Sequence, residues 1–354
     1  MRNNGLKSML QLALAVTAIT VYFYNTEIII QAAKDAMVLC YTTVIPSLFV
    51  FMVISAFLSD LKCSQLLSIP FTPVFRLLNI HNRKIISYCV LSILSGFATG
   101  GYFIDKMRKE FNCSENMTGV ISIIISNNSP AFIISAVGVG MLGHFSSGLI
   151  LYFSILISSF ITAFIFSFLF PYSPVQSKKT NNILKSSFTA ALTSSTSAII
   201  NICGVVIFAF CVCKVILLYS KNLYFSLFFS ILCEVTTSCK FIVDNIGKNL
   251  YLICIALSFC PLSCCLQIKS MGDNKSFSLK ILLLSKLLHI PLSLTILRIA
   301  INLFPQSFAV YANGDINVNL YWNAPHISFC FLLLSLCFVI LFDKQIGVFT
   351  IFRK

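Results

Sequence analysis

The sequence has few charged residues. Asp, Glu, Lys and Arg together make up 10% of the 354 residues, and only 11 residues are acidic. A soluble domain of this length needs a polar surface, which this composition cannot provide. Hydrophobic residues make up 58% of the chain, and several apolar runs approach or exceed the roughly 20 residues that a helix needs to cross a hydrocarbon layer. The composition therefore predicts an all-α polytopic membrane protein that contacts a lipid bilayer.

The sequence also lacks the motifs of common catalytic and metal sites. No hydrolase, phosphate-loop or kinase pattern occurs, and Gly138-x-Gly140 follows no predicted strand, so it indicates helix packing. The 15 cysteines stand inside apolar runs without a Cys-x-x-Cys and a matching His or Cys pair. In such runs Cys behaves as a small apolar residue. We therefore expect no enzymatic activity, no cofactor and no metal site.

Basic residues are concentrated in alternate predicted loops. In a soluble protein the net charge of +14 would suggest a nucleic-acid partner, but no basic and aromatic patch lies outside the apolar runs, so we expect none. Lysines and arginines occur at 60–84, 106–109 and 171–187, whereas 304–323 has none. Because cytoplasmic loops carry the excess of Lys and Arg, we expect both termini to be cytoplasmic.

The predicted crossings divide the chain into five parts. We expect a first transmembrane helix and an outside loop (1–35), a first repeat (36–170), a cytoplasmic linker (171–187), a second repeat (188–303), and an external loop, last helix and cytoplasmic tail (304–354). Each repeat contains a spanning helix, a re-entrant hairpin, a broken helix and a final span. Three crossings per repeat would make the second repeat inverted relative to the first, with about eight spanning helices in all.

Small and polar residues interrupt the apolar runs. The sequence Ser126-Asn127-Asn128-Ser129-Pro130 separates two apolar halves, and Ser95-Gly96 and Cys233-Glu234 end two other runs. A helix in lipid can break only where its freed backbone groups face protein or water, and transporters place their solute sites at such breaks. We therefore expect a substrate path lined by Ser95, Gly96, Thr99, Ser126, Asn127, Asn128, Ser129, Glu234, Thr236 and Gln267.

Several of these residues also have structural interpretations. Ser129 or Asn128 is suited to cap a helix that begins at Pro130, and small residues around Gly96 allow close helix packing. Gln267 either binds solute or faces water near the cytoplasmic end. These structural and functional interpretations stay open at this point.

Glu234 is the strongest single candidate, because a lone carboxylate at membrane depth is costly and usually has a purpose. It either binds a coupling proton or cation, or it pairs with Lys240 or Lys286. Lys286 and His289 are three residues apart and share a helical face. They either attract an anion or have structural roles, and we favour the second: Lys286 extends to the membrane surface and His289 hydrogen-bonds within the bundle.

Several segments resemble a known family. The segments that carry the resemblance occur in order between residues 36 and 301: Ile45-Pro46-Ser47-Leu48-Phe49-Val50-Phe51, Leu94-Ser95-Gly96-Phe97-Ala98-Thr99-Gly100, Ser126 to Ile133, Ala136 to Met141, Glu234-Val235-Thr236, and Leu262-Ser263 with Gln267. They resemble the YlbJ-like sporulation integral membrane proteins of the nucleoside-recognition (Gate) domain group. The chain departs from the family pattern at Phe97 and Ala98, and at Cys260-Pro261.

The resemblance implies a multi-pass protein of the bacterial cell membrane or the outer forespore membrane. The family is linked to moving dipicolinate from the mother cell across the outer forespore membrane during sporulation. Together with the predicted broken helices, this favours a transporter for a small polar or anionic solute, either dipicolinate or a nucleoside-like molecule. The alternative is a non-transporting membrane component needed for assembly of the spore envelope or cortex.

Overall fold

The computed structural model describes residues 2–173, 175, 188–220, 222–270 and 278–304. These ranges are helical with no strand, which confirms the predicted all-α class. Within them, four helical segments are long and apolar enough to cross a membrane, and one bent pair would make a fifth. The predicted last helix (327–342), the loop before it and most of the linker at 171–187 lie outside the described residues.

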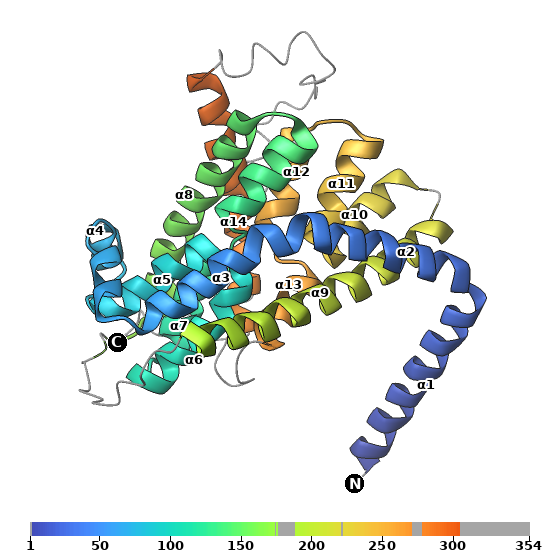
Figure 1. Cartoon of the computed structure of the whole chain (residues 1–354), viewed down its shortest axis with the longest axis horizontal. Coiled ribbons are helices and arrows are strands. Elements are labelled where there is room, and N and C mark those ends of the chain that lie inside the picture. The colour runs from blue at the N-terminus through green and yellow to red at the C-terminus, as the bar shows by residue number, and fades with distance from the viewer. Residues whose placement is uncertain (1, 174, 176–187, 221, 271–277, 305–354) are drawn as a thin grey trace.

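The two halves of the chain have the same order of elements. The first half contains a bent helix, a helical hairpin, a broken helix and a straight helix: α2–η1–α3 (Thr26–Leu39, Cys40–Val44, Ile45–Asp60), α5–α6 (Arg83–Ser95, Phe97–Phe111), α7–η3 (Glu115–Ile125, Ala131–Leu142) and α8 (Phe145–Leu169). The second half repeats this order with α9 (Phe188–Tyr219), α10–α11 (Leu223–Cys233, Val235–Asn245), α12–α13 (Leu250–Ser258, Leu262–Ser270) and α14 (Leu279–Leu303). Helix α1 (Arg2–Tyr24) precedes both and projects away from the other helices in Figure 1.

The expected outside loop at 24–35 is wrong, because α2 begins at Thr26 and leads through the π-helical segment η1 into α3. Ala32 and Ala36 of α2 are buried against Phe210 of α9, and this packing favours helix over loop. The two parts of the bent helix meet at 52°. The bend lies next to Pro46, which has no N–H to donate to the preceding turn.

The predicted loop at 60–84 also contains packed structure. It includes the short helices η2 (Lys62–Ser68) and α4 (Thr72–Leu77). Phe75 and Leu78 from this segment are buried in the same apolar cluster as residues of α5, α6 and α7. The Tyr172 hydroxyl, from the segment after α8, donates a hydrogen bond to the Leu78 carbonyl. The segment is therefore part of the helical body.

Corresponding elements of the two halves contact each other. The bent helix α2–η1–α3 lies antiparallel to α9 along one side of the molecule (Figure 1). At one end the Tyr219 hydroxyl donates to Asn25 Oδ1 over 2.9 Å, and at the other the rings of Phe57 and Phe188 are 5.8 Å apart. Helix α8 packs against α14. The hairpins and broken helices are thus held between elements that match in chain order.

Two glycines bring the backbones of α8 and η3 close together. A Cβ built on Gly148 of α8 would lie 2.7 Å from the Ile134 Cα of η3, and one built on Gly138 of η3 would lie 2.7 Å from the Gly148 Cα. Small residues let helices approach closely in a membrane, where van der Waals packing drives their association. The two glycines therefore set the spacing between α8 and η3.

We predict that Gly148→Ala lowers the free energy of unfolding by about 1–3 kcal/mol, because the added methyl group must push two backbones apart. Gly204→Ala is the matched control, since a Cβ at Gly204 meets no atom within 4 Å. In the interior of α9 that change should be neutral or stabilising by about 0.5–1 kcal/mol. Thermal unfolding in detergent measures both, and equal melting temperatures for the two variants would contradict the close approach.

Candidate functional site

The polar residues at the first helix break supply donors to freed backbone carbonyls. Asn127 Nδ2 donates to the Ile124 carbonyl over 2.9 Å, and Ser92 Oγ donates to the Ile125 carbonyl over 3.5 Å. Ser129 Oγ accepts from the Phe132 N–H over 3.1 Å at the start of η3. The predicted capping role of this cluster is therefore confirmed for Ser129.

The second break is satisfied from distant parts of the chain. In a regular helix the N–H of residue 261 would donate to the Leu257 carbonyl, four residues earlier. Residue 261 is a proline, which has no N–H, so this bond is missing. Asn128 Nδ2, from the other break, donates to this carbonyl over 3.1 Å. His289 Nδ1 lies 3.2 Å from the next carbonyl, that of Ser258. One amide and one imidazole from elsewhere in the fold therefore complete the end of α12.

Glu234 stands between the two helices of the second hairpin and caps α11. Its side chain is 1% exposed, and Oε2 accepts from the Thr237 N–H over 2.5 Å and from Thr237 Oγ1 over 2.8 Å. The predicted alternative of an ion pair is wrong, because neither Lys240 nor Lys286 is paired with Glu234 in the described structure. The free N–H groups and the dipole at the start of α11 stabilise the carboxylate instead.

Gly96 occupies the corresponding position in the first hairpin. Its φ of +92° favours glycine, and a Cβ there would lie 3.0 Å from both Cβ and N of Ser129. The neighbouring hydroxyls of Ser95 and Thr99 are 2.8 Å apart, and Thr99 Oγ1 donates to the Gly96 carbonyl over 2.9 Å. The first hairpin tip therefore touches the start of η3 with its backbone.

The two hairpin tips, the first break and Gln267 of α13 meet at one small cavity, called here the central cavity. Its volume is about 30 Å³, room for roughly two water molecules. Seven predicted path residues line it: Ser95, Gly96, Asn128, Ser129, Glu234, Thr236 and Gln267. The structure thus brings together residues that are up to 172 positions apart, from 95 to 267.

The other three predicted path residues do not line the central cavity. Thr99 faces a second cavity described below. Ser126 and Asn127 are buried at the first break, where Ser126 Oγ and Asn127 Oδ1 have no hydrogen-bond partner in the described part of the chain. Their polar atoms are therefore available to water or to a ligand that reaches the break.

The apolar wall of the central cavity was not predicted. This wall consists of Val44, Leu48, Phe97, Phe132, Ile202, Val206 and Val235. Such residues inside apolar runs are indistinguishable from those that face lipid. The antiparallel pairing of η1 and α3 with α9 places four of them, Val44, Leu48, Ile202 and Val206, at the cavity.

Lys286 and His289 share a helical face as predicted, but Lys286 does not extend to the membrane surface. It is 3% exposed, because α14 packs against α7, α8 and α12. Lys286 Nζ lies 3.3 Å from His289 Nδ1, and His289 Nε2 lies 3.2 Å from the Ile155 carbonyl. The predicted hydrogen bonding of His289 within the bundle is confirmed, and neither residue lines the central cavity.

Known proteins provide no further guide to the site. No family model, curated protein sequence or solved structure matches this chain. Within the described ranges, no three His, Cys, Asp or Glu side chains are grouped so that they could hold a metal ion. The functional argument therefore depends on the geometry around the central cavity.

We predict that Asn128→Ala lowers the free energy of unfolding by about 1–3 kcal/mol, because it leaves the buried Leu257 carbonyl without a donor. Asn245→Ala is the matched control, since Asn245 makes a similar bond to the Phe241 carbonyl at an exposed position. Adding Pro261→Ala supplies a backbone N–H near Leu257 and should reduce the cost of Asn128→Ala. Equal thermal stability of the two single variants would count against the cross-break bond.

Proposed function

We propose that this protein transports a small polar or anionic solute across a membrane. The observation that carries the proposal is the central cavity, where polar residues from two hairpin tips and two broken helices meet inside an apolar bundle. Polar and ionisable groups at such depth are costly and usually mark a solute or ion pathway. An assembly factor without transport activity has no need of polar groups there.

We propose that the two halves form inverted repeats. The common order of elements and the contacts of α2–η1–α3 with α9 and of α8 with α14 support this arrangement. Each half would cross the membrane three times, so the second would run in the opposite sense. With α1 and the predicted helix at 327–342, the protein would have about eight spans and cytoplasmic termini.

Two helix starts around the central cavity support an anionic solute. Gly96 and Phe97 begin α6, and Ser129 lies at the start of η3. Free N–H groups and the positive end of the helix dipole attract anions. Dipicolinate, the solute implied by the resemblance to YlbJ-like proteins, is a planar dianion of this class. Transport across the outer forespore membrane or cell membrane belongs to the same proposal.

The volume of the central cavity implies a conformational change in the transport cycle. About 30 Å³ accommodates roughly two water molecules, whereas a pyridine ring with two carboxylates is much larger. The described conformation therefore has no room for such a solute, and a hairpin would have to move to admit it. Glu234, at a hairpin tip, is placed to couple this movement to binding of a proton or cation.

We predict that reconstituted protein takes up labelled dipicolinate saturably, and that Glu234→Gln lowers the rate of uptake at least about tenfold, because it removes the buried charge proposed to couple ion binding to movement. Asp244→Asn is the matched control, since Asp244 is an exposed acid on the same helix, α11. It should leave uptake unchanged. Vesicle uptake under proton and sodium gradients measures both variants and the wild type.

The outcomes separate transport from assembly. Uptake that is absent under every gradient, with folded protein in the vesicles, would overturn the transport proposal. Normal sporulation in a strain that carries Glu234→Gln would then favour the non-transporting component, because an assembly factor depends on packing and loops. Uptake that is equal in both variants would remove Glu234 from the mechanism and leave transport itself intact.

A further inference from the structure

A second cavity lies beside the central cavity and is not explained by a solute site alone. It has a volume of about 30 Å³ and is enclosed by α3, α6 and α9. Its lining residues are Met52, Ser55, Ala56, Thr99, Tyr102, Phe103, Ser194, Ser195 and Ala198. Hydroxyl groups from all three helices therefore face one small space, which we call the serine cavity.

The two cavities follow each other along the same helix pair. On α3 the central cavity is lined by Leu48 and the serine cavity by Met52, one helical turn further. On α9 the corresponding residues are Ile202 and Ala198. Because α3 and α9 are antiparallel, both steps lead in the same direction, toward the end of the molecule that holds residue 59.

The partition between the cavities is a single hydrogen-bonded turn. Ser95 lines the central cavity and Thr99 lines the serine cavity, and their hydroxyls are 2.8 Å apart. Both residues belong to the tip of the hairpin α5–α6. A shift of this tip would therefore join the two spaces without breaking a helix in the wall.

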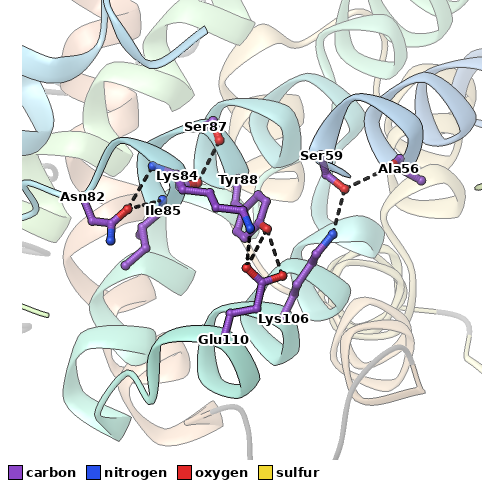
Figure 2. Close-up of polar contacts among 9 residues, drawn as sticks. All are labelled: Ala56, Ser59, Asn82, Lys84, Ile85, Ser87, Tyr88, Lys106 and Glu110. Carbon is purple, nitrogen blue, oxygen red and sulfur yellow. Dashed lines mark hydrogen bonds and ion pairs between the residues drawn. The ribbon is translucent and has the colours of Figure 1, made fainter. Parts of the chain in front are cut away.

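Polar groups continue beyond the serine cavity to the base of the hairpin. Tyr102, Lys106 and Glu110 follow Thr99 on α6 at intervals of three and four residues, and so lie along one face. Lys106 Nζ donates to Ser59 Oγ over 3.0 Å (Figure 2) and lies 5.7 Å from the centre of the Tyr102 ring. This face therefore connects the serine cavity to the basic end of the molecule.

Figure 2 shows how the base of the hairpin is held together. Lys84 Nζ, at the start of α5, lies 2.8 Å from Glu110 Oε2, near the end of α6. The Tyr88 hydroxyl donates to the same carboxylate over 3.0 Å, and its ring lies 5.2 Å from Lys106 Nζ. These contacts fix Lys106 at the end of the polar face.

The opposite direction along the same helix pair is apolar and packed. Cys40, Val44 and Val206 belong to one buried cluster, and Ala36 and Phe210 to the next. These residues leave no polar face toward the Asn25 end. The hydroxyl groups of the serine cavity thus lie on one side of the central cavity, and the cluster residues named on its other side are apolar.

We propose that the serine cavity and the α6 face from Thr99 to Lys106 form the route between the central cavity and the basic end of the protein. The route takes small anionic solutes, and Lys106 is their contact at its outer end, because a fixed cation at a narrow entrance favours anions. The passage of solute depends on the proposed transport function. The access of water to the route does not, and it can be measured separately.

Thiol labelling tests the route. Ser55→Cys and Ser195→Cys place thiols in the serine cavity, and Ile54→Cys and Ile200→Cys are matched controls on the neighbouring faces, where the native side chains are 47% and 64% exposed at the apolar surface. A membrane-impermeant, anionic methanethiosulfonate is added to the cytoplasmic face of inside-out vesicles. Peptide mass spectrometry identifies each modified cysteine, so the native cysteines can remain.

We expect the serine-cavity thiols to react at least about tenfold faster than the control thiols, because only thiols in contact with water form the reactive thiolate. Ser195→Trp should close the route and lower dipicolinate uptake at least about tenfold, by filling the cavity with an indole. Thermal unfolding of Ser195→Trp checks that it remains folded. Unreactive thiols at 55 and 195, or reaction only from the opposite face, would overturn the route.

The outer contact is tested by Lys106→Met, with Lys106→Arg and Lys109→Met as controls. Lys109 is 63% exposed and paired with Asp105. Lys106→Met should raise the solute concentration for half-maximal uptake at least about fivefold, since it removes a fixed positive charge near the path. Neither control variant should change this concentration. An unchanged value would remove Lys106 from the route. Reactive thiols without any uptake would support the route and overturn the transport function.

Discussion

The structure depends on one constraint: inside a bilayer, every carbonyl freed by a helix break must find a donor within the protein. The two breaks meet this constraint differently. The first is satisfied by Asn127 within the break and by Ser92 of the neighbouring helix α5. The second contains Pro261 and depends on Asn128 and His289 from other elements. The breaks must therefore lie against their donors, and this requirement places them at the centre of the molecule.

The central cavity is a consequence of that placement. Two hairpin tips with unlike residues, Gly96 and Glu234, enter the same region as the breaks. Gly96 brings backbone against Ser129, whereas Glu234 brings a carboxylate that its own helix stabilises. The site is accordingly asymmetric, although the two halves share their order of elements. In the proposed transporter, this asymmetry would give a solute and a coupling ion different surroundings.

The sequence predicted the helical class, the hairpins, the breaks and the polar half of the lining of the central cavity. The hairpin tips, the breaks and the polar lining can be recognised locally in the sequence, because each has a polar or small residue inside an apolar run. The helix at 26–39 was missed because its burial depends on Phe210 of α9. The burial of Lys286 and the existence of the serine cavity likewise depend on which helices pack together. In the sequence alone, Ser195 is indistinguishable from any other serine in a helix, and only its position next to α3 and α6 places it in the cavity.

The bond from Asn128 to the Leu257 carbonyl joins the first half of the chain to the second. Separating the two broken helices would strand a carbonyl in the low-dielectric interior, so they are expected to behave as one rigid block. The hairpin tips have no such tie to the opposite half among the described hydrogen bonds: Ser95, Thr99 and Glu234 bond within their own hairpins. If the hairpins move in the proposed transport cycle, the Asn128 bond between the two halves does not have to break.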